Sequence, residues 1–197
     1  MLTGSTNFTL TDTGKNADGN NLNHVLVLHG RTAAGLYLRE FERLRSGTFG
    51  ELRERREPKP REFRLGRIRV KPIFAPHQGP EMEIMKQMLK AERRVDFAMF
   101  TFAQSSGIDD TMFWLLKAGI PVRGVLDRGQ GSQAWAATKP LKVKGALLYE
   151  NTPGTGVRKV HHTDPAAEQA QRALAAYVLA EIDRIVTDLS RPVAGPI

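Results

Sequence analysis

The chain has 197 residues, of which 41% are hydrophobic and 25% are charged, and its formal net charge is +8. These proportions are typical of a globular protein with one or two compact units and a real core. The absence of cysteine excludes disulfides and thiolate metal sites. No apolar run approaches the roughly 18 residues of a membrane span. No leader precedes Gly4, so we expect a cytoplasmic location by default, unless an N-terminal leader is missing.

The first predicted elements are a strand and a helix. Val25–Leu28 is a continuous apolar run, which is typical of a buried strand. From Thr32 onward, apolar residues recur at helical spacing up to Leu44, and Gly47 ends the pattern. Residues 46–62 are rich in charge and contain two prolines, which predicts a connector between two folded parts.

The middle of the chain predicts an α/β fold. Strands are expected at 69–74, 95–102, 121–127 and 145–149, and helices from Pro80 and over 108–118. The buried face of the helix from Pro80 is expected to comprise Met82, Ile84, Met85, Met88 and Leu89. Alternating strands and helices predict right-handed crossovers and a mixed β-sheet flanked by helices. Asp127 ends a strand at the edge where α/β proteins place sites, but we favour the interpretation that it caps a helix.

The last part of the chain predicts one further helix. Asp164 has the side chain of an N-cap, and Pro165 would occupy the first helical position. Apolar residues then recur at helical spacing until Ser190. Such an extra C-terminal helix needs a cover, which is either the body of the protein or another copy of the chain.

The positive charge is concentrated in one segment of 19 residues. Its basic residues are Arg53, Arg55, Arg56, Lys59, Arg61, Arg64, Arg67, Arg69 and Lys71. The simpler interpretation is a solvated connector, and the functional one is a surface for nucleic acid or an anionic membrane. Because Phe63 is the only aromatic residue there, the segment does not indicate base stacking.

Two short motifs carry the functional hypothesis. Gly4-Ser5-Thr6-Asn7 is a glycine turn with amide and hydroxyl groups, and residues 157–160 form a predicted strand that ends at His161. Together they resemble the phospholipase D superfamily, whose motif is His-x-Lys-x4-Asp followed by Gly-Ser-x-Asn. The inverted order suggests a fragment. We assign 1–50 to the end of a first repeat, 51–66 to a basic connector, 67–162 to most of a second repeat, and 163–197 to a helical tail outside the family.

The resemblance implies a metal-independent phosphodiesterase without a cofactor. By this resemblance His161 would attack phosphorus and form a phosphohistidine. Ser5 and Asn7 would bind phosphoryl oxygens, and Asn21 or Asn23 would orient the imidazole. The substrates implied are phosphodiesters, either phospholipid head groups or nucleic acid.

The motif at His161 is incomplete, which leaves alternatives open. Thr163 stands at the position of the motif lysine, and Glu168 stands at that of the aspartate. We prefer a phospholipase D-type activity, with a nuclease as the alternative. A further alternative is a phosphate-binding remnant without activity, because acid–base catalysis needs two imidazoles at one phosphorus. A homodimer would bring two His161 residues together.

Overall fold

The computed structural model describes residues 1–49, 61–76, 78–161, 163–167 and 180–193. It divides the chain into two compact units, each of which is described by itself. The first comprises Met1–Thr3 and Val25–Glu83, and the second comprises Gly4–His24 and Ile84–Ile197. These limits differ from the segments expected from the resemblance, because Gly4–His24 joins the second unit. The assignment of the segments to two repeats stays a prediction.

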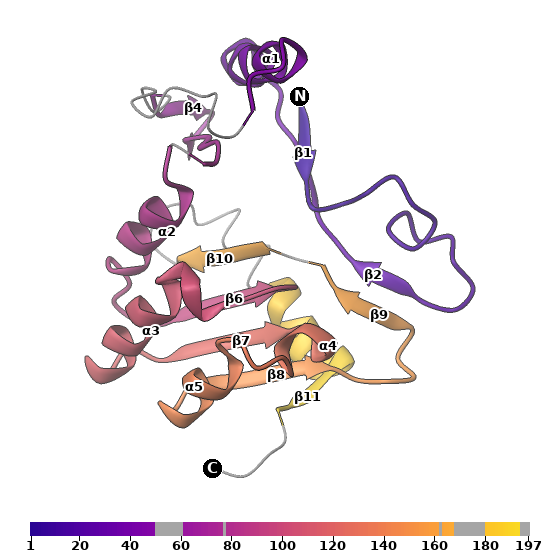
Figure 1. Ribbon diagram of the computed structural model, residues 1–197, viewed down its shortest axis with the longest axis vertical. Helices are drawn as coiled ribbons and strands as arrows, with labels where there is room; N and C mark the ends of the chain where they lie inside the picture. The colour runs from indigo at the N-terminus through magenta and orange to yellow at the C-terminus, as the bar shows by residue number, and fades with distance from the viewer. Residues whose placement is uncertain (50–60, 77, 162, 168–179, 194–197) are drawn as a thin grey trace. The chain divides into compact units, whose positions relative to one another are not determined.

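The first unit consists of small sheets and one long helix (Figure 1). Its elements are β1 (Leu2–Gly4), which pairs with β3 (Val25–Val27), α1 (Arg31–Arg45), β4 (Phe63–Leu65) and β5 (Ile68–Val70). Strands β4 and β5 form an antiparallel hairpin around Gly66, which has a positive φ of 59°. Helix α2 (Pro80–Met88) leads from this unit into the second and begins at the proline, as predicted.

Several burial expectations for this part of the chain are wrong. The strand at Val25–Val27 exists, but both valines are exposed because a two-stranded sheet covers little apolar surface. Helix α1 exists too, yet the apolar residues Leu38, Phe41 and Leu44 of its stripe are exposed. In α2, Met88 is buried while Met82 is exposed, as is Leu89 just beyond the helix.

Two strand boundaries also need correction. The strand expected at 69–74 ends at Val70, before Pro72, which has no N–H for a ladder hydrogen bond. Strand β4 lies inside the predicted connector 51–66, because alternating Phe63 and Leu65 pair with β5. Residues 50–60 of that connector lie outside the described residues.

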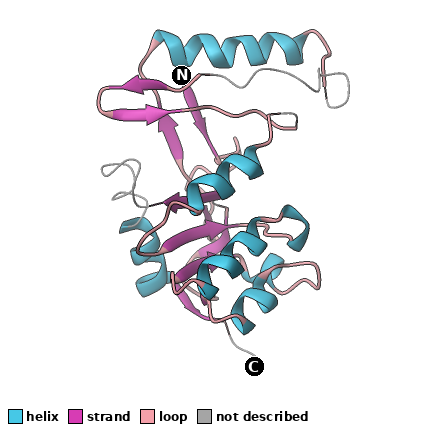
Figure 2. Cartoon of the chain, turned by 90° about the vertical axis from the view of Figure 1, so that its left-hand side faces the viewer, coloured by secondary structure: helices cyan, strands magenta, loops and turns pink. Residues whose placement is uncertain are grey.

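The second unit is built on one mixed five-stranded sheet with the order β10-β6-β7-β8-β11 (Figures 1 and 2). Its strands are β6 (Val95–Met99), β7 (Val122–Leu126), β8 (Leu147–Asn151), β10 (Thr163–Ala167) and β11 (Ser190–Pro192). The three central strands run parallel, and the two outer strands pair with them antiparallel. The mixed α/β class expected from the sequence is therefore confirmed. The three central strands exist, but β6 ends at Met99 and not at 102, and β8 covers Leu147–Asn151 and not 145–149.

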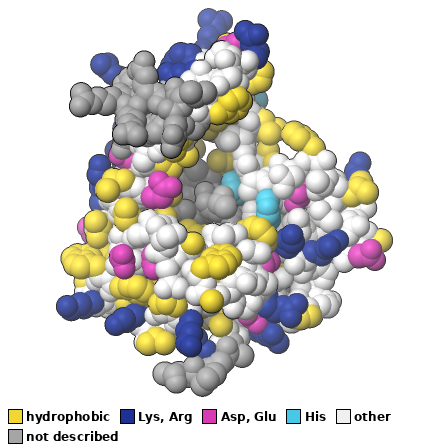
Figure 3. Space-filling view, in the orientation of Figure 1, with side chains coloured by type: hydrophobic (Ala, Val, Ile, Leu, Met, Phe, Trp, Pro, Cys, Tyr) yellow, Lys and Arg dark blue, Asp and Glu magenta, His cyan; other side chains and the backbone are white. Residues whose placement is uncertain are grey.

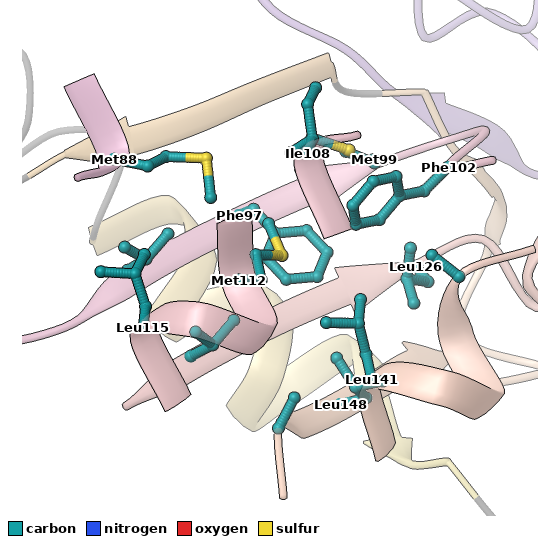
Figure 4. Close-up of a cluster of buried hydrophobic side chains, with 14 residues drawn as sticks. Met88, Phe97, Met99, Phe102, Ile108, Met112, Leu115, Leu126, Leu141 and Leu148 are labelled. Carbon is teal, nitrogen blue, oxygen red and sulfur yellow. The ribbon is translucent and has the colours of Figure 1, made fainter. Parts of the chain in front are cut away.

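One face of this sheet carries the larger core (Figure 4). Strand residues Phe97, Leu126 and Leu148 point to this face because alternate residues of a strand share a side. Helix α3 (Ile108–Lys117) covers them with Met112 and Leu115, and α5 (Thr138–Val143) contributes a further leucine. Helix α3 begins at the residue predicted and ends one residue earlier than expected.

The C-terminal part of the chain covers the opposite face. Residues 180–184 are helical, and Ile185–Leu189 continue as a π-helical turn. Ile182 and Ile185 are buried against Ala98 and Val125 of the sheet. Of the two expected partners for this segment, it therefore packs against the body of the protein.

The predicted start of the C-terminal helix is wrong. Asp164 and Pro165 belong to β10, which pairs along β6 from Thr163 opposite Met99 to Ala167 opposite Val95. The exposed edge of β6 offers unpaired backbone groups, and satisfying them outweighs the local capping signal. A proline is compatible with this outer position because an edge strand has one set of N–H groups facing away from the sheet. Residues 168–179 of the expected helix lie outside the described residues.

Candidate functional site

The candidate site lies within the second unit, where two short strands bring distant segments together. Strand β2 (Asn20–Leu22) pairs in parallel with β9 (Val157–Val160). The pairing extends to His161, whose backbone N–H donates to Leu22 O at 2.9 Å. Gly19 permits it, because a Cβ at this position would stand 2.7 Å from the carbonyl oxygen of Gly156.

This pairing places His161 beside two residues singled out in the sequence. Its Nδ1 lies 2.9 Å from Asn23 Oδ1 and 3.0 Å from the backbone oxygen of Ser5. The Ser5 hydroxyl lies 3.4 Å from the same Asn23 oxygen. The three groups come from segments up to 156 positions apart. Among the described residues, the other ring nitrogen of His161, Nε2, has no hydrogen-bond partner.

Asp12 is a member of the cluster that the sequence reasoning missed. Its Oδ1 accepts hydrogen bonds from Asn23 Nδ2 at 2.6 Å and from Asn21 Nδ2 at 2.8 Å, and Oδ2 accepts one from Thr9 Oγ1 at 2.8 Å. Partial burial raises the pKa of this carboxyl, but the hydrogen bonds outweigh it and hold the pKa well below its ordinary value. The one sequence signal is a Thr-rich turn around an aspartate, a pattern typical of side-chain-closed turns.

The other predicted site residues do not contact the imidazole. Asn7 is exposed, and its side chain hydrogen-bonds to Asp12. Asn21 donates to the same carboxylate, while its own side-chain oxygen is buried and has no hydrogen-bond partner in the described part of the chain. Of the two amides expected to orient His161, the structure therefore brings only Asn23 to it.

A second histidine belongs to the same cluster. His24 is half-buried, and its Nδ1 lies 3.3 Å from the Ser5 hydroxyl. The His24 backbone N–H donates to that hydroxyl at 3.2 Å. Ser5 therefore links two imidazoles, through its carbonyl to His161 and through its side chain to His24. Figure 3 shows that histidine side chains reach the molecular surface.

An aromatic ring lies beside His161, and a cation lies over that ring. The ring centroids of Phe100 and His161 are 5.1 Å apart, at an interplanar angle of 52°. Lys159 places its Nζ 5.2 Å from the Phe100 centroid, within the range of a cation–π interaction. Because alternate strand residues share a side, Lys159 and His161 project to the same side of β9.

Asp127 stabilises the strand that carries His161 by accepting hydrogen bonds from backbone N–H groups. Its Oδ1 accepts from the N–H groups of Gly129 and Gln130, both at 3.0 Å, which confirms the capping interpretation. Its Oδ2 accepts at 3.3 Å from the N–H of Val160, the residue before His161. The buried carboxylate thus holds the end of β9 against the sheet.

The structure describes little of the residues that follow His161 in the incomplete motif. His162 and Glu168 lie outside the described residues, and Thr163 is described only as part of β10. Within the described residues, no group of three or more His, Asp or Glu side chains could hold a metal ion. The same part of the chain contains no helix that is both long and apolar enough to cross a membrane.

No family model matches the chain, and no curated protein matches it.

Proposed function

We propose that the chain contains part of a phospholipase D-like phosphodiesterase repeat, in which His161 forms a phosphohistidine. The preferred substrate is a phospholipid, cleaved at its head group. The observation that carries the proposal is the contact of His161 Nδ1 with Asn23 and Ser5, which supports an imidazole with Nε2 left open to a substrate. The Gly-Ser-x-Asn turn and the strand ending in histidine are the motif elements that meet there.

The first chemical step would use the Nε2 lone pair of His161. This lone pair forms an N–P bond, and the P–O bond to the leaving group breaks with its electron pair going to the oxygen. An alkoxide leaving group then needs a proton. His24, which contacts Ser5 as His161 does, is the candidate proton donor within the cluster, and a second copy of His161 in a homodimer is the alternative.

The second step would return the histidine to its starting state. A water molecule attacks phosphorus, the N–P bond breaks, and its electron pair returns to Nε2. The proton released by the water passes to the group that protonated the leaving oxygen, or to solvent. Transphosphatidylation follows the same course with an alcohol in place of water.

The phosphoryl oxygens need a cation during both steps, and Lys159 is suited to supply it. The motif lysine is missing, because Thr163 stands at its position. Lys159 is exposed, and its ammonium group lies 5.2 Å from the ring of Phe100, which itself lies beside His161. An ammonium group beside the attacked phosphorus stabilises the negative charge that develops there.

Hydrolysis of bis(p-nitrophenyl) phosphate in the presence of a metal chelator tests the proposal. Its weakly basic leaving group needs no acid, so the assay isolates attack by His161. We expect His161→Ala to lower the rate by at least about a hundredfold. His29→Ala, which changes an exposed histidine in the first unit, should keep the wild-type rate.

Equal rates in the wild type and His161→Ala would contradict the enzymatic proposal and favour an inactive phosphate-binding remnant. A rate per chain that rises with protein concentration would indicate the homodimer. The role of His24 is tested with an alkyl phosphodiester, whose leaving group requires an acid. If His24 donates the proton, His24→Ala should lower the rate more for this substrate than for the nitrophenyl ester.

The β4–β5 hairpin favours a nuclease as the second candidate function. Arg64 and Arg69 stand directly opposite each other in its register, and both are exposed. Like charges in this relation destabilise a hairpin, and an anionic ligand would relieve the repulsion. Glu62 lies 3.8 Å from Arg69 and compensates part of it.

Binding to single-stranded and double-stranded DNA at several salt concentrations tests this candidate. A nucleic-acid surface predicts affinity that falls steeply with salt and is weakened by Arg64→Glu. Lys117→Glu, a charge reversal in the second unit, is the control. Affinity that is absent or independent of salt would leave the lipid substrate as the better proposal.

A further inference from the structure

We propose that Asp12 is a positioning residue that fixes the tautomer of His161 through the side chain of Asn23. The carboxylate, the amide and the imidazole form a chain of contacts. Asp12 Oδ1 lies 2.6 Å from Asn23 Nδ2, and Asn23 Oδ1 lies 2.9 Å from His161 Nδ1. Asp12 itself has no hydrogen bond to the imidazole, so its effect passes through the amide.

The charge on Asp12 determines which way the Asn23 amide faces. An ionised carboxylate is a pure acceptor, so the group facing it must be the NH₂ end of the amide. Rotating the amide by 180° would bring two oxygens into the 2.6 Å contact. The depressed pKa keeps Asp12 charged throughout the neutral and mildly acidic range. The amide orientation thus follows from the hydrogen-bond network.

The amide orientation in turn determines where His161 holds its proton. Both groups that face Nδ1, the Asn23 side-chain oxygen and the Ser5 carbonyl, are acceptors. A neutral imidazole therefore carries its hydrogen on Nδ1, and the lone pair is on Nε2. A rotated amide would present an NH₂ group to Nδ1 and favour the opposite tautomer.

Several interactions hold Asp12 in place for this role. Thr9 donates to its second oxygen, and Asn21 shares the first oxygen with Asn23. The backbone N–H of Asp12 is bonded within the same turn, to the Thr9 carbonyl at 3.2 Å. Because its carboxylate accepts several hydrogen bonds at once, the Asp12 side chain is held in one orientation and does not rotate freely in solvent.

This role deepens the proposed function, because a phosphohistidine at Nε2 requires the lone pair there, but it can be measured without any substrate. The full chain is labelled with ¹⁵N-histidine, and the two ring nitrogens are read by long-range proton–nitrogen correlation at a pH where the imidazole is neutral. The His161 signals are identified by their loss in His161→Ala. The wild type should show a protonated Nδ1 and an unprotonated Nε2.

Asp12→Ala should lower the ratio of Nδ1–H to Nε2–H about fivefold, because the amide can then rotate while the Ser5 carbonyl remains as an acceptor. Asp12→Asn, which retains an oxygen for the Asn23 amide, should restore most of the ratio. Asp18→Ala removes an exposed carboxylate from the same loop and should leave the ratio unchanged.

Two results would overturn the inference. One is a wild-type His161 that carries its proton on Nε2, a result that requires no Asp12 variant. The other is an unchanged ratio in an Asp12→Ala protein whose backbone amide spectrum is native. If the tautomer behaves as expected and no phosphodiester is cleaved, the positioning role stands while the proposed activity fails.

Discussion

The ring of Phe97 lies directly against Gly124, its partner on the neighbouring strand, and fills the space that a side chain there would take. The two residues face each other in the register of β6 and β7. A Cβ on Gly124 would overlap three carbons of the ring. Phe97 is fully buried and also meets Phe102 edge-to-face, with centroids 5.6 Å apart, so it has little room to move.

We therefore expect Gly124→Ala to destabilise the second unit by about 1–3 kcal/mol, the usual cost of overpacking a core. Urea denaturation followed by fluorescence would measure it. Gly35→Ala is a useful contrast, because a Cβ in the middle of α1 meets nothing closer than 3.8 Å. That change should stabilise the helix by about 0.5–1 kcal/mol. An unchanged midpoint for Gly124→Ala would contradict the packing described for Phe97.

Lys159 provides a test of the proposed cation. Lys159→Ala should lower kcat/KM for a phosphodiester by about tenfold to a hundredfold, since a group that stabilises developing charge has been removed. Arg158→Ala is the matched control, because it removes the same charge from the adjacent residue, which projects to the other side of β9. Equal losses of kcat/KM in the two variants would show that Lys159 acts only through its contribution to the overall positive charge.

A buried ion-pair network connects the sheet to the C-terminal segment. Asp96 is 1% exposed and accepts from Arg94 Nε at 2.6 Å and Arg123 Nε at 2.5 Å. Arg123 also lies 2.7 Å from Asp183, in the segment that covers the second face. Removing one partner leaves a buried charge poorly compensated, which is strongly destabilising.

Arg123→Met should accordingly cost about 3–5 kcal/mol in the free energy of unfolding. Limited proteolysis should also cut more readily near residues 180–189, because the covering segment loses its ion pair. Arg191→Met breaks an ion pair between Arg191, half exposed, and Glu150 and should cost less than about 1 kcal/mol. Similar losses in both variants would show that burial of Asp96 has little energetic effect.

Asp109 predicts a dependence of stability on pH. Burial raises the pKa of this carboxyl above its ordinary value of 3.8, and the nearby Asp110 adds to the shift. The folded state therefore holds the proton more tightly than the unfolded state. The contribution of this group to stability falls as pH rises from about 3.8 through the raised pKa, and is constant above it.

Asp109→Asn should remove this fall, so that the variant gains thermal stability relative to the wild type as pH increases from 4 to 7. Thermal unfolding monitored by circular dichroism at several pH values measures the difference. Asp110→Asn, which changes an exposed carboxylate in the same turn, should retain most of the fall. A wild-type and an Asp109→Asn curve that run parallel would contradict the shift.

The central strands could be predicted because one physical cause dominates them. Val95–Met99 is buried on both faces, so its apolar run reflects its environment directly. The capping role of Asp127 was equally accessible, because it depends on the two residues that follow it. The apolar stripe of α1 predicted the helix correctly, but periodicity alone does not establish which partner, if any, covers it.

The strand β10 and the contacts around His161 could not be predicted, because they depend on contacts between distant segments. Pro165 carries a local helix signal, and pairing with β6 overrides it. Asn23 could be proposed through its resemblance to an orienting residue, whereas Asp12 lies 11 positions from it in a turn without periodicity. Which of Asn21 and Asn23 reaches the imidazole depends on the pairing of β2 with β9, and no spacing in the sequence establishes that pairing.

The antiparallel outer strands of the large sheet have a consequence for synthesis. Both β10 and β11 follow the parallel strands in the chain, and β11 ends only at Pro192. During translation, β6, β7 and β8 leave the ribosome before either partner of their outer edges is available. The nascent chain therefore presents two open β-edges, a state prone to aggregation, and chaperone dependence in the cell would be its expected signature.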